Sequence, residues 1–572
     1  MYFNSKGKEE VTYDAIVIGS GISGGWAVKE LTEKGLKVLC LERGRMLKHG
    51  DYPTANLERW EVPNRGRLSQ EELKVYAVQS RTGYTVNHFT THLWPKDTEH
   101  PYTETKPFDW IRGYHVGGRS IMWGKHCYRL SDINFEENAK EGVAIDWPIR
   151  YNDIKPWYDY VEAFAGISGQ KENSKSTPNG IYQPPFELNC VEQVARDAVM
   201  KAFNGARIIS PGRVAHITNK GGHNGRGTCL TRNRCIRGCP YGAYFSSNAA
   251  TIPPAEATGN LTIRPHSIAH SIIFDDETQL ATGVNVIDSE TMESHEFFAK
   301  IIFCNASALH SAAILMNSKS DRFPDGMGND SGELGHNVMD HHFKAGAAGF
   351  YDGYEDRYYK GRKPAGIFIP RFRNVDGPNN MKDFTRGYGF QGGASRLGWT
   401  RPAEAMMGES LKDELSHPGK WRMNLLAFGE CLPYHDNKMT LRYDKLDKWG
   451  IPTLDLDVEW KENEYAMRKD MSLTAAEMLD AAGFKNIQQY DNVKDSNPGN
   501  GIHEMGTARM GRDPKTSVLN KWNQIHAVKN VFVTDGACMT SAANQNPSIT
   551  YMALTARAAD YAVKELHKGN LS

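Results

Sequence analysis

Three cysteines stand close together in the middle of the chain and could bind a metal. They are Cys229, Cys235 and Cys239, in the stretch "GTCLTRNRCIRGCPYGA" at residues 227–243. A zinc ion would need a fourth ligand, for which His223 is the nearest candidate. Zinc ligand pairs, however, usually lie two to four residues apart, and these spacings are longer. Three unrelated cysteines in a loop are the simpler alternative.

A glycine-rich turn near the start of the chain predicts a dinucleotide site. An apolar run at residues 15–18 precedes it, a helical stretch follows, and its pattern is Gly19-x-Gly21-x-x-Gly24. A second apolar run, at residues 37–41, ends at Glu42. Such glycines let a pyrophosphate approach the backbone at a helix N-terminus, and the acid can accept hydrogen bonds from a ribose. The alternative is a tight turn that binds nothing.

The segment after this unit favours a flavin over a nicotinamide. Residues 45–110 are polar and rich in Pro, His, Tyr and Trp, without the strand–helix alternation with which a compact nicotinamide domain continues. A second glycine cluster at 113–124 and apolar stretches at 299–318 and 530–539 fit a cofactor domain assembled from distant segments, and the 299–318 stretch is expected to be a strand.

A different pattern fills residues 340–460. Several runs there alternate apolar and polar residues, with Gly, Pro and Asn between them, and they predict a mainly antiparallel sheet. The predicted fold class is therefore α/β, with a Rossmann-like FAD-binding domain and an interleaved substrate-binding domain built on this sheet. An aromatic-rich face of such a sheet would suit a sugar-sized substrate, although such residues are more often core.

Composition excludes several classes of partner. The 572 residues carry a formal net charge of +0, with 68 basic and 68 acidic side chains and no basic stripe, so neither nucleic acid nor an anionic membrane is an expected partner. No apolar stretch is long enough for a membrane span, and the first residues carry no export signal. Nine cysteines in so long a chain argue against a disulfide framework, so reduced thiols are expected.

Five blocks in order carry a family resemblance over essentially the whole chain. Together they resemble the glucose-methanol-choline (GMC) family of flavoprotein oxidoreductases. The blocks are the glycine fingerprint at 19–24, "VGGRSIMWG" at 116–124, "GELGHNVMDHH" at 332–342, "GIHEMGTARMG" at 501–511 and "TDGACMTSAANQNPSITYMALTARAAD" at 534–560.

The resemblance implies how the chain divides and how it binds FAD. Residues 10–50, 110–135, 205–340 and 500–572 are expected to form the FAD-binding domain. Residues 51–109, 136–204 and 341–499 are expected to form the substrate-binding domain and cap segments. Some relatives attach the flavin through a histidine before the tryptophan of the second block, but Met122 stands here, so noncovalent FAD is expected. The expected FAD-binding residues are Gly19, Ser20, Gly21, Ile22, Ser23, Gly24, Glu42, Arg43, Gly117, Gly118, Ser120, Trp123, Gly124, Asp535, Gly536 and Asn546.

The resemblance also assigns the catalytic residues. His503 matches the family's general base, and a neutral histidine suits removal of a hydroxyl proton. Asn546 matches its partner, whose amide can bind the same substrate oxygen. Each has a structural alternative, because His503 could be an ordinary loop histidine and Asn546 the N-cap of a helix in which Pro547 is the first residue. For His341 and His342 no role beyond proximity to the site is expected, and His126 is expected near the flavin.

The cysteine stretch resembles the iron–sulfur motif of bacterial multisubunit sugar dehydrogenases. This implies that Cys229, Cys235 and Cys239 hold a [3Fe–4S] cluster, in which each iron takes one protein sulfur. Because a cluster passes single electrons, the chain is expected to be a dehydrogenase rather than an oxidase. The expected partners are a small subunit that bears an export signal and a cytochrome c acceptor, which would place the protein in the periplasm. A cytoplasmic location is the alternative.

The expected substrate is a pyranose or pyranoside. The block wording favours oxidation at C3 to a 3-keto glycoside, with oxidation of glucose at C1, or of another polyol or sugar acid, as the alternative within the family. Two other classes stay open: a nicotinamide-dependent dehydrogenase, and a flavoprotein that only transfers electrons and has no sugar activity.

Overall fold

A seven-stranded sheet forms the centre of the cofactor side of the molecule. A computed structural model describes residues 13–357 and 366–571. The strands are β1 (Tyr13–Ile18), β2 (Val38–Leu41), β5 (Leu261–Arg264), β6 (Ser267–Asp275), β7 (Leu280–Asp288), β8 (Ser294–Cys304) and β16 (Val531–Phe532). Their order is β5-β2-β1-β8-β7-β6, with β16 also on β8. The first four in this order and β16 run parallel, whereas β6 and β7 form an antiparallel edge. The short apolar runs at 15–18 and 38–41 are fully buried, as parallel strands covered on both faces must be.

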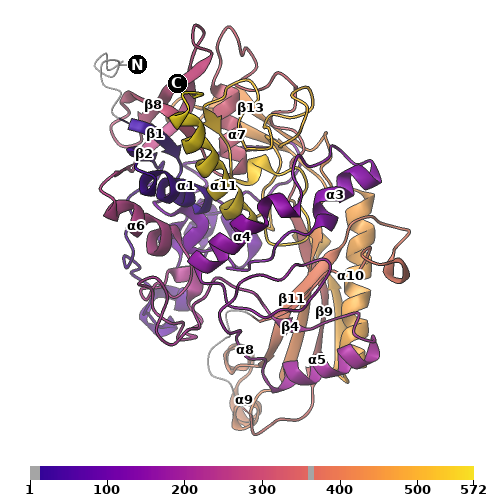
Figure 1. The fold of residues 1–572 in the computed structure, drawn as a ribbon. Helices are drawn as coiled ribbons and strands as arrows, with labels where there is room; N and C mark the ends of the chain where they lie inside the picture. Colours follow the sequence, from indigo (N-terminus) through magenta and orange to yellow (C-terminus); the bar gives the residue numbers. More distant parts are fainter. Residues whose placement is uncertain (1–12, 358–365, 572) are drawn as a thin grey trace.

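Helices cover this sheet (Figure 1). α1 (Ile22–Glu33) packs against α11 (Ser548–His567), and α11 also packs against α4 (Tyr151–Ala165). α7 (Ala308–Asn317) lies beside β6. The prediction that residues 299–318 form a strand is therefore half wrong, because α7 occupies the second half. An apolar run by itself does not distinguish a buried strand from a buried helix.

The second sheet is antiparallel throughout. It consists of β4 (Ser210–Pro211), β9 (His341–Tyr351), β10 (Ile367–Ile369), β11 (Tyr388–Arg396), β12 (Trp421–Glu430) and β15 (Lys485–Asp491). The order is β15-β9-β12-β11-β10-β4. α10 (Glu462–Ala481) packs on β9 and β12, with α5 (Cys190–Ala202) beside it. β12 alternates buried and half-buried positions, so the predicted two-residue period is confirmed there.

A small third sheet packs on the cofactor side of the molecule. β13 (Lys438–Leu446) pairs antiparallel with β14 (Pro452–Asp457), which pairs parallel with β3 (Thr103–Glu104). β13 also contacts α7 on the cofactor side. The remaining helices are α2 (Gln70–Val75), α3 (Asp132–Glu141), α6 (Ile252–Ala257), α8 (Thr400–Ala405) and α9 (Gly408–Ser416).

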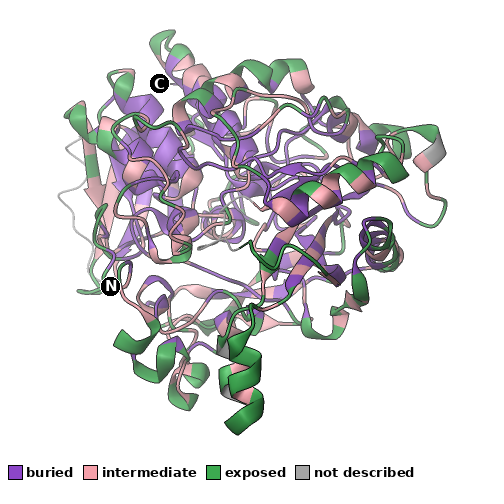
Figure 2. Cartoon of the chain, turned by 90° about the horizontal axis from the view of Figure 1, so that it is seen from below, coloured by how far each residue is buried: buried purple, intermediate pink, exposed green. Residues whose placement is uncertain are grey.

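Burial follows this layering (Figure 2). Buried residues concentrate in the sheets and on the helix faces that cover them, while α9 has no buried residue. α4 comes from the segment assigned to the substrate-binding domain, yet its Phe164 ring lies 5.1 Å from Trp26 of α1. The predicted domain boundaries otherwise stay a prediction.

None of the helices in the described ranges is both long and apolar enough to cross a bilayer. The first residues, on which the expectation about an export signal rests, lie largely outside the described ranges.

Candidate active site

One cavity of about 780 Å³ takes its lining from both main sheets and the glycine-rich turns. The turn after β1 and the acid after β2 both reach it, because parallel strands present their carboxyl ends at one edge of a sheet. All the predicted FAD-binding residues line it except Gly24 and Gly117, and Met122 and His126 line it too.

The glycines of the first turn do different work. A Cβ on Gly24 would lie 1.8 Å from the carbonyl oxygen of Gly19, so Gly24 allows close packing of the turn on α1. Gly19 has φ of +88°, which favours glycine. A Cβ on Gly21 would meet nothing within 4 Å. The open backbone therefore lies at Gly21, at the N-terminus of α1, where a pyrophosphate fits.

Glu42 is buried in the wall of the cavity. One of its carboxylate oxygens accepts from the Ser20 hydroxyl at 2.5 Å and from the Ser20 N–H at 3.2 Å, and the other accepts from the Gly44 N–H at 3.0 Å. Burial raises the pKa of Glu42, although these hydrogen bonds act in the opposite direction. The carboxylate is thus held in place with lone pairs left for a ribose hydroxyl.

Unpartnered polar atoms in the cavity wall also fit a cofactor. Asn305 Nδ2 and Tyr551 Oη are buried, and neither finds a hydrogen-bond partner among the residues that the structure describes. Buried polar atoms normally have a partner, so a bound group is expected to supply one. These atoms, the open turn and Glu42 together fit a dinucleotide such as FAD.

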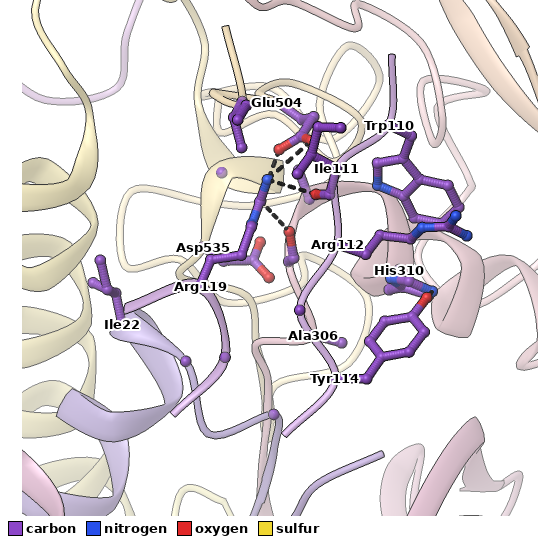
Figure 3. A pocket seen from close by; sticks show the side chains of 18 of the residues that line it. Ile22, Trp110, Ile111, Arg112, Tyr114, Arg119, Ala306, His310, Glu504 and Asp535 are labelled. Carbon is purple, nitrogen blue, oxygen red and sulfur yellow. Dashed lines mark hydrogen bonds and ion pairs between the residues drawn. The ribbon is translucent and has the colours of Figure 1, made fainter. Parts of the chain in front are cut away.

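An arginine that sequence reasoning missed ties two motif blocks together (Figure 3). Arg119 makes a two-pronged ion pair with Glu504, at 3.0 and 2.7 Å, and also donates to the Ile111 carbonyl and the Ser307 hydroxyl. Burial lowers the pKa of Arg119, but Glu504 raises it and the net shift is upward. The pair holds the segment that carries His503 against the glycine-rich segment of the cofactor domain.

A buried aspartate holds the backbone of the predicted base. Asp340 accepts from the N–H groups of His503 at 3.0 Å and Gly501 at 2.8 Å. Burial raises the pKa of Asp340 to about 7, with Glu504 adding to the shift.

A chain of three groups sets which nitrogen of His503 carries the proton. His341 Nε2 lies 2.7 Å from the Ala543 carbonyl, which can only accept, so this nitrogen is protonated. Burial lowers the pKa of His341 to about 4, so the ring is neutral and its Nδ1 is an acceptor. His503 Nδ1 lies 2.8 Å from that Nδ1 and must donate to it. The Nε2 atom of His503 is therefore left as an unprotonated acceptor.

The second predicted catalytic residue faces that nitrogen. Asn546 Nδ2 lies 3.5 Å from His503 Nε2, and Gln391 of β11 donates to Asn546 Oδ1 at 2.5 Å. Because Gln391 occupies the oxygen, the amide NH2 points toward His503. The alternative role as an N-cap is wrong: α11 begins at Ser548, its capping residue is Pro547, and the carbonyl of Pro547 accepts the first helix bonds.

The predicted catalytic pair thus comes together from distant segments. The sequence did not predict the two residues that hold the pair in place. His341 and Gln391 are 162 and 155 residues from the partners they contact. The "MDHH" motif marked His341 as close to a family block, and nothing in the sequence signalled Gln391.

The three cysteines line one small cavity beside the cofactor cavity. Cys229, Cys235 and Cys239 all border it, and Cys235 Sγ lies 3.6 Å from His216 Nε2. The next residue after Cys235, Ile236, lines the large cavity. Within the described ranges, no group of three or more His, Cys, Asp or Glu residues could hold a single metal ion.

The alternative zinc site is not supported. His223, its proposed fourth ligand, does not border the cysteine cavity, and its Nε2 atom lies 2.8 Å from the Ala163 carbonyl. His216 is the histidine that the fold places beside the cysteines, and its pKa is well below the usual value because it is buried.

Buried neutral histidines predict a loss of stability in mild acid. Burial lowers the pKa values of His115 and His341 to about 4, whereas in the unfolded chain both titrate near 6.5. Below about pH 6.5 the unfolded chain therefore binds more protons, and stability falls as the pH drops toward 4. We expect a loss of about 2 kcal/mol per such histidine at pH 5. Urea unfolding at pH 7, 6 and 5 measures this, and a constant midpoint would contradict it.

The comparisons with known proteins indicate a single family. Residues 13–343 and 433–555 match two family models, both described as GMC oxidoreductase. The chain is 29% identical to 2-methyl-1,2-propanediol dehydrogenase of Mycolicibacterium austroafricanum, over 96% of this chain and 94% of the relative. It is 26% identical to the fructose dehydrogenase large subunit of Gluconobacter japonicus, over 98% and 99%. The solved structure of an Aspergillus oryzae formate oxidase variant shares the fold, with a TM-score of 0.61, 15% identity and coverage of 98% and 99%.

Proposed function

Because the chain belongs to the GMC oxidoreductase family, and is thus an FAD-dependent dehydrogenase of alcohol or sugar CH–OH groups, we propose that it oxidises a pyranose or pyranoside at C3 to a 3-keto product. One observation carries the chemistry: His503 Nε2, unprotonated, faces the Asn546 amide in the wall of the cofactor cavity. A sugar substrate is supported by relatives named fructose dehydrogenase and paromamine 6'-oxidase. The choice of C3 rests on the resemblance to glucoside 3-dehydrogenases.

The residues of the site divide the work of the reaction. When bound, FAD accepts the hydride from the carbon that is oxidised. His503 Nε2 takes the hydroxyl proton, and a base is most effective when it is already neutral at the working pH. Burial lowers the pKa of His503 well below its usual value, so it is neutral at pH 7. The NH2 group of Asn546 can donate to the same oxygen and stabilise the charge that develops there.

His341 acts in this scheme as a positioning residue, because it does not contact the substrate oxygen. Its Nδ1 atom accepts a hydrogen bond from His503 Nδ1, which keeps the proton of His503 on that nitrogen and leaves Nε2 unprotonated. Replacing His341 with alanine removes this acceptor, and we expect kcat/KM to fall about 10- to 100-fold. His341→Asn has an amide oxygen that can accept the same hydrogen bond. This variant should recover part of the loss, and its kcat/KM should depend on pH as in the parent protein. Equal losses in both variants would contradict the positioning role.

Cys229, Cys235 and Cys239 are proposed to hold a [3Fe–4S] cluster. In such a cluster each iron binds its own thiolate, so the three sulfurs need not converge on one point as they do around a single ion. The buried ammonium of Lys125 lines the cofactor cavity and donates to the Cys235 carbonyl at 3.2 Å, so the two cavities share a wall. When bound, a cluster transfers single electrons.

The partners follow from the same proposal. The fructose dehydrogenase relative is called a large subunit, which supports a complex with other chains. We propose a small subunit that carries the export signal and a cytochrome c acceptor, and hence a periplasmic location.

One anaerobic absorbance experiment tests the proposal against its alternatives. Glucose or methyl glucoside should bleach the flavin bands of the purified protein, and the product should be a ketone. A lactone formed from glucose, which acidifies the medium, would instead show oxidation at C1, and methyl glucoside, whose C1 is blocked, would then leave the flavin oxidised. A flavin that no sugar or polyol bleaches would leave an electron-transfer protein, and colourless protein that needs NAD would exclude a flavoenzyme altogether.

A further inference from the structure

We propose that Lys344 forms a carboxylate-binding subsite in the substrate part of the cavity, so that the sugar substrate carries an acid group away from the carbon that is oxidised. The proposal rests on the proposed function and narrows its substrate class. Lys344 belongs to β9, the strand on which His341 contacts the catalytic base, and its side chain lines the same cavity as His503 and Asn546.

A β-bulge gives this lysine its unusual position. Along the pairing of β9 with β12, Ala345 lies opposite Ala427 and His342 lies opposite Gly429. Phe343 and Lys344 therefore share the single partner position of Phe428, which is one residue too many for a regular ladder. Lys344 absorbs the irregularity with φ of +64°, a left-handed conformation that a lysine seldom adopts. Bulges beside active sites commonly redirect a side chain, and here both residues of the bulge, Phe343 and Lys344, line the cavity.

Among the described residues, no carboxylate contacts the ammonium of Lys344. This ammonium makes long hydrogen bonds to two backbone carbonyls, 3.4 Å to Thr82 and 3.5 Å to Asp495, and lies 5.8 Å from the centroid of the Phe343 ring. Lys344 forms no ion pair with any residue of the ranges 13–357 and 366–571. The charges of Asp109 and Asp495 raise the pKa of Lys344 without forming an ion pair with it, and the charge of Arg468 lowers it. Asp109 is already bound by Asn497 and Asn500.

Lys344 is half buried, so its charged ammonium is unfavourable as long as no anion is bound beside it. Burial lowers the pKa of Lys344 below its usual value, which is the sign of a charge that its surroundings do not fully compensate. An incoming anion would supply the missing partner through a charge-assisted hydrogen bond. A single ammonium matches the single charge of a carboxylate, whereas bidentate recognition of a phosphate favours arginine.

The neighbouring walls suit a sugar ring between the base and the cation. Phe343 and Phe428 stack with centroids 5.2 Å apart, and Tyr84 meets Phe343 edge-on at 6.4 Å. All three line the cavity. Lys344 stands three residues after His341 on β9, so the cation and the partner of the catalytic base come from the same strand.

A matched substrate pair tests the subsite. Methyl β-glucoside and methyl β-glucuronide differ only at C6, where the second bears a carboxylate. We expect the FAD-loaded protein to prefer the glucuronide at least about tenfold in kcat/KM. Lys344→Met should lower kcat/KM for the glucuronide about 10- to 100-fold and change the glucoside less than about threefold. Lys344→Arg should retain most of the preference. Lys412→Met, on the exposed face of α9, is the control and should change nothing.

Calorimetric titration of the two sugars separates this inference from the proposed function. Tighter binding of the glucuronide, lost in Lys344→Met, supports the subsite whether or not turnover follows. Equal affinity for both sugars, or an equal effect of Lys344→Met on both, would overturn it. Preferential glucuronide binding without flavin bleaching by either sugar would overturn the proposed sugar oxidation and leave the subsite standing.

Discussion

Replacing His503 with alanine is expected to lower sugar-driven flavin reduction at least about a hundredfold, while FAD stays bound. The factor is the typical contribution of a general base, and no other neutral ring nitrogen faces Asn546 within the described part of the chain. Stopped-flow absorbance under anaerobic conditions measures the reduction rate directly. The flavin spectrum of the oxidised protein measures how much cofactor remains.

The same variant separates catalysis from cofactor binding. The elements that fit FAD are the turn at Gly21, the carboxylate of Glu42 and the unpartnered polar atoms of Asn305 and Tyr551, and none of them uses the His503 side chain. His417→Ala, at an exposed position, is a matched control that should behave like the parent protein. Near-normal reduction in His503→Ala would remove this residue from the mechanism, and loss of flavin would show that its role is structural.

Exchange of Cys235 for serine should have the opposite pattern. We expect the sugar to reduce the flavin at a normal rate, while turnover with a one-electron acceptor such as a cytochrome c falls almost to background. The reason is that serine removes one of the three sulfurs proposed to hold iron, at a loop that borders the cofactor cavity through Ile236. Steady-state reduction of the acceptor, compared with single-turnover bleaching, measures the difference.

Iron content gives this test a second readout. The parent protein, purified without oxygen, should contain about three iron atoms per chain, and Cys235→Ser should contain clearly less. Cys190→Ser is the control, because Cys190 lies at the start of α5 and does not border the cavity lined by Cys229, Cys235 and Cys239. If the variant keeps normal turnover with the acceptor, or if the parent protein holds no iron, the three cysteines have no part in electron transfer.

The local pattern of the sequence was enough for the first strand–helix–strand unit of the cofactor half of the fold. The run at 15–18, the glycine turn and the helix to residue 33 lie where the pattern predicts, because strand, turn and helix follow one another within 21 residues and their signals are local. The burial of α11 has the same local origin: Ile549, Met552 and Ala556 repeat at helical spacing and are all buried. Resemblance, rather than periodicity, supplied His503, Asn546 and the cysteines.

Only the tertiary structure decided how these residues work. Nothing local marks His341 or Gln391, because each acts on a partner more than 150 residues away and the contact exists only after the two sheets pack together. The proton position on His503 depends on the Ala543 carbonyl, a backbone atom that no residue type encodes. The bulge that exposes Lys344 to the cavity is a mismatch between β9 and β12, and a mismatch appears only when the two strands are aligned. The amino-acid sequence by itself therefore determined the elements and the chemistry they carry, and packing decided which side chains hold the protons and charges.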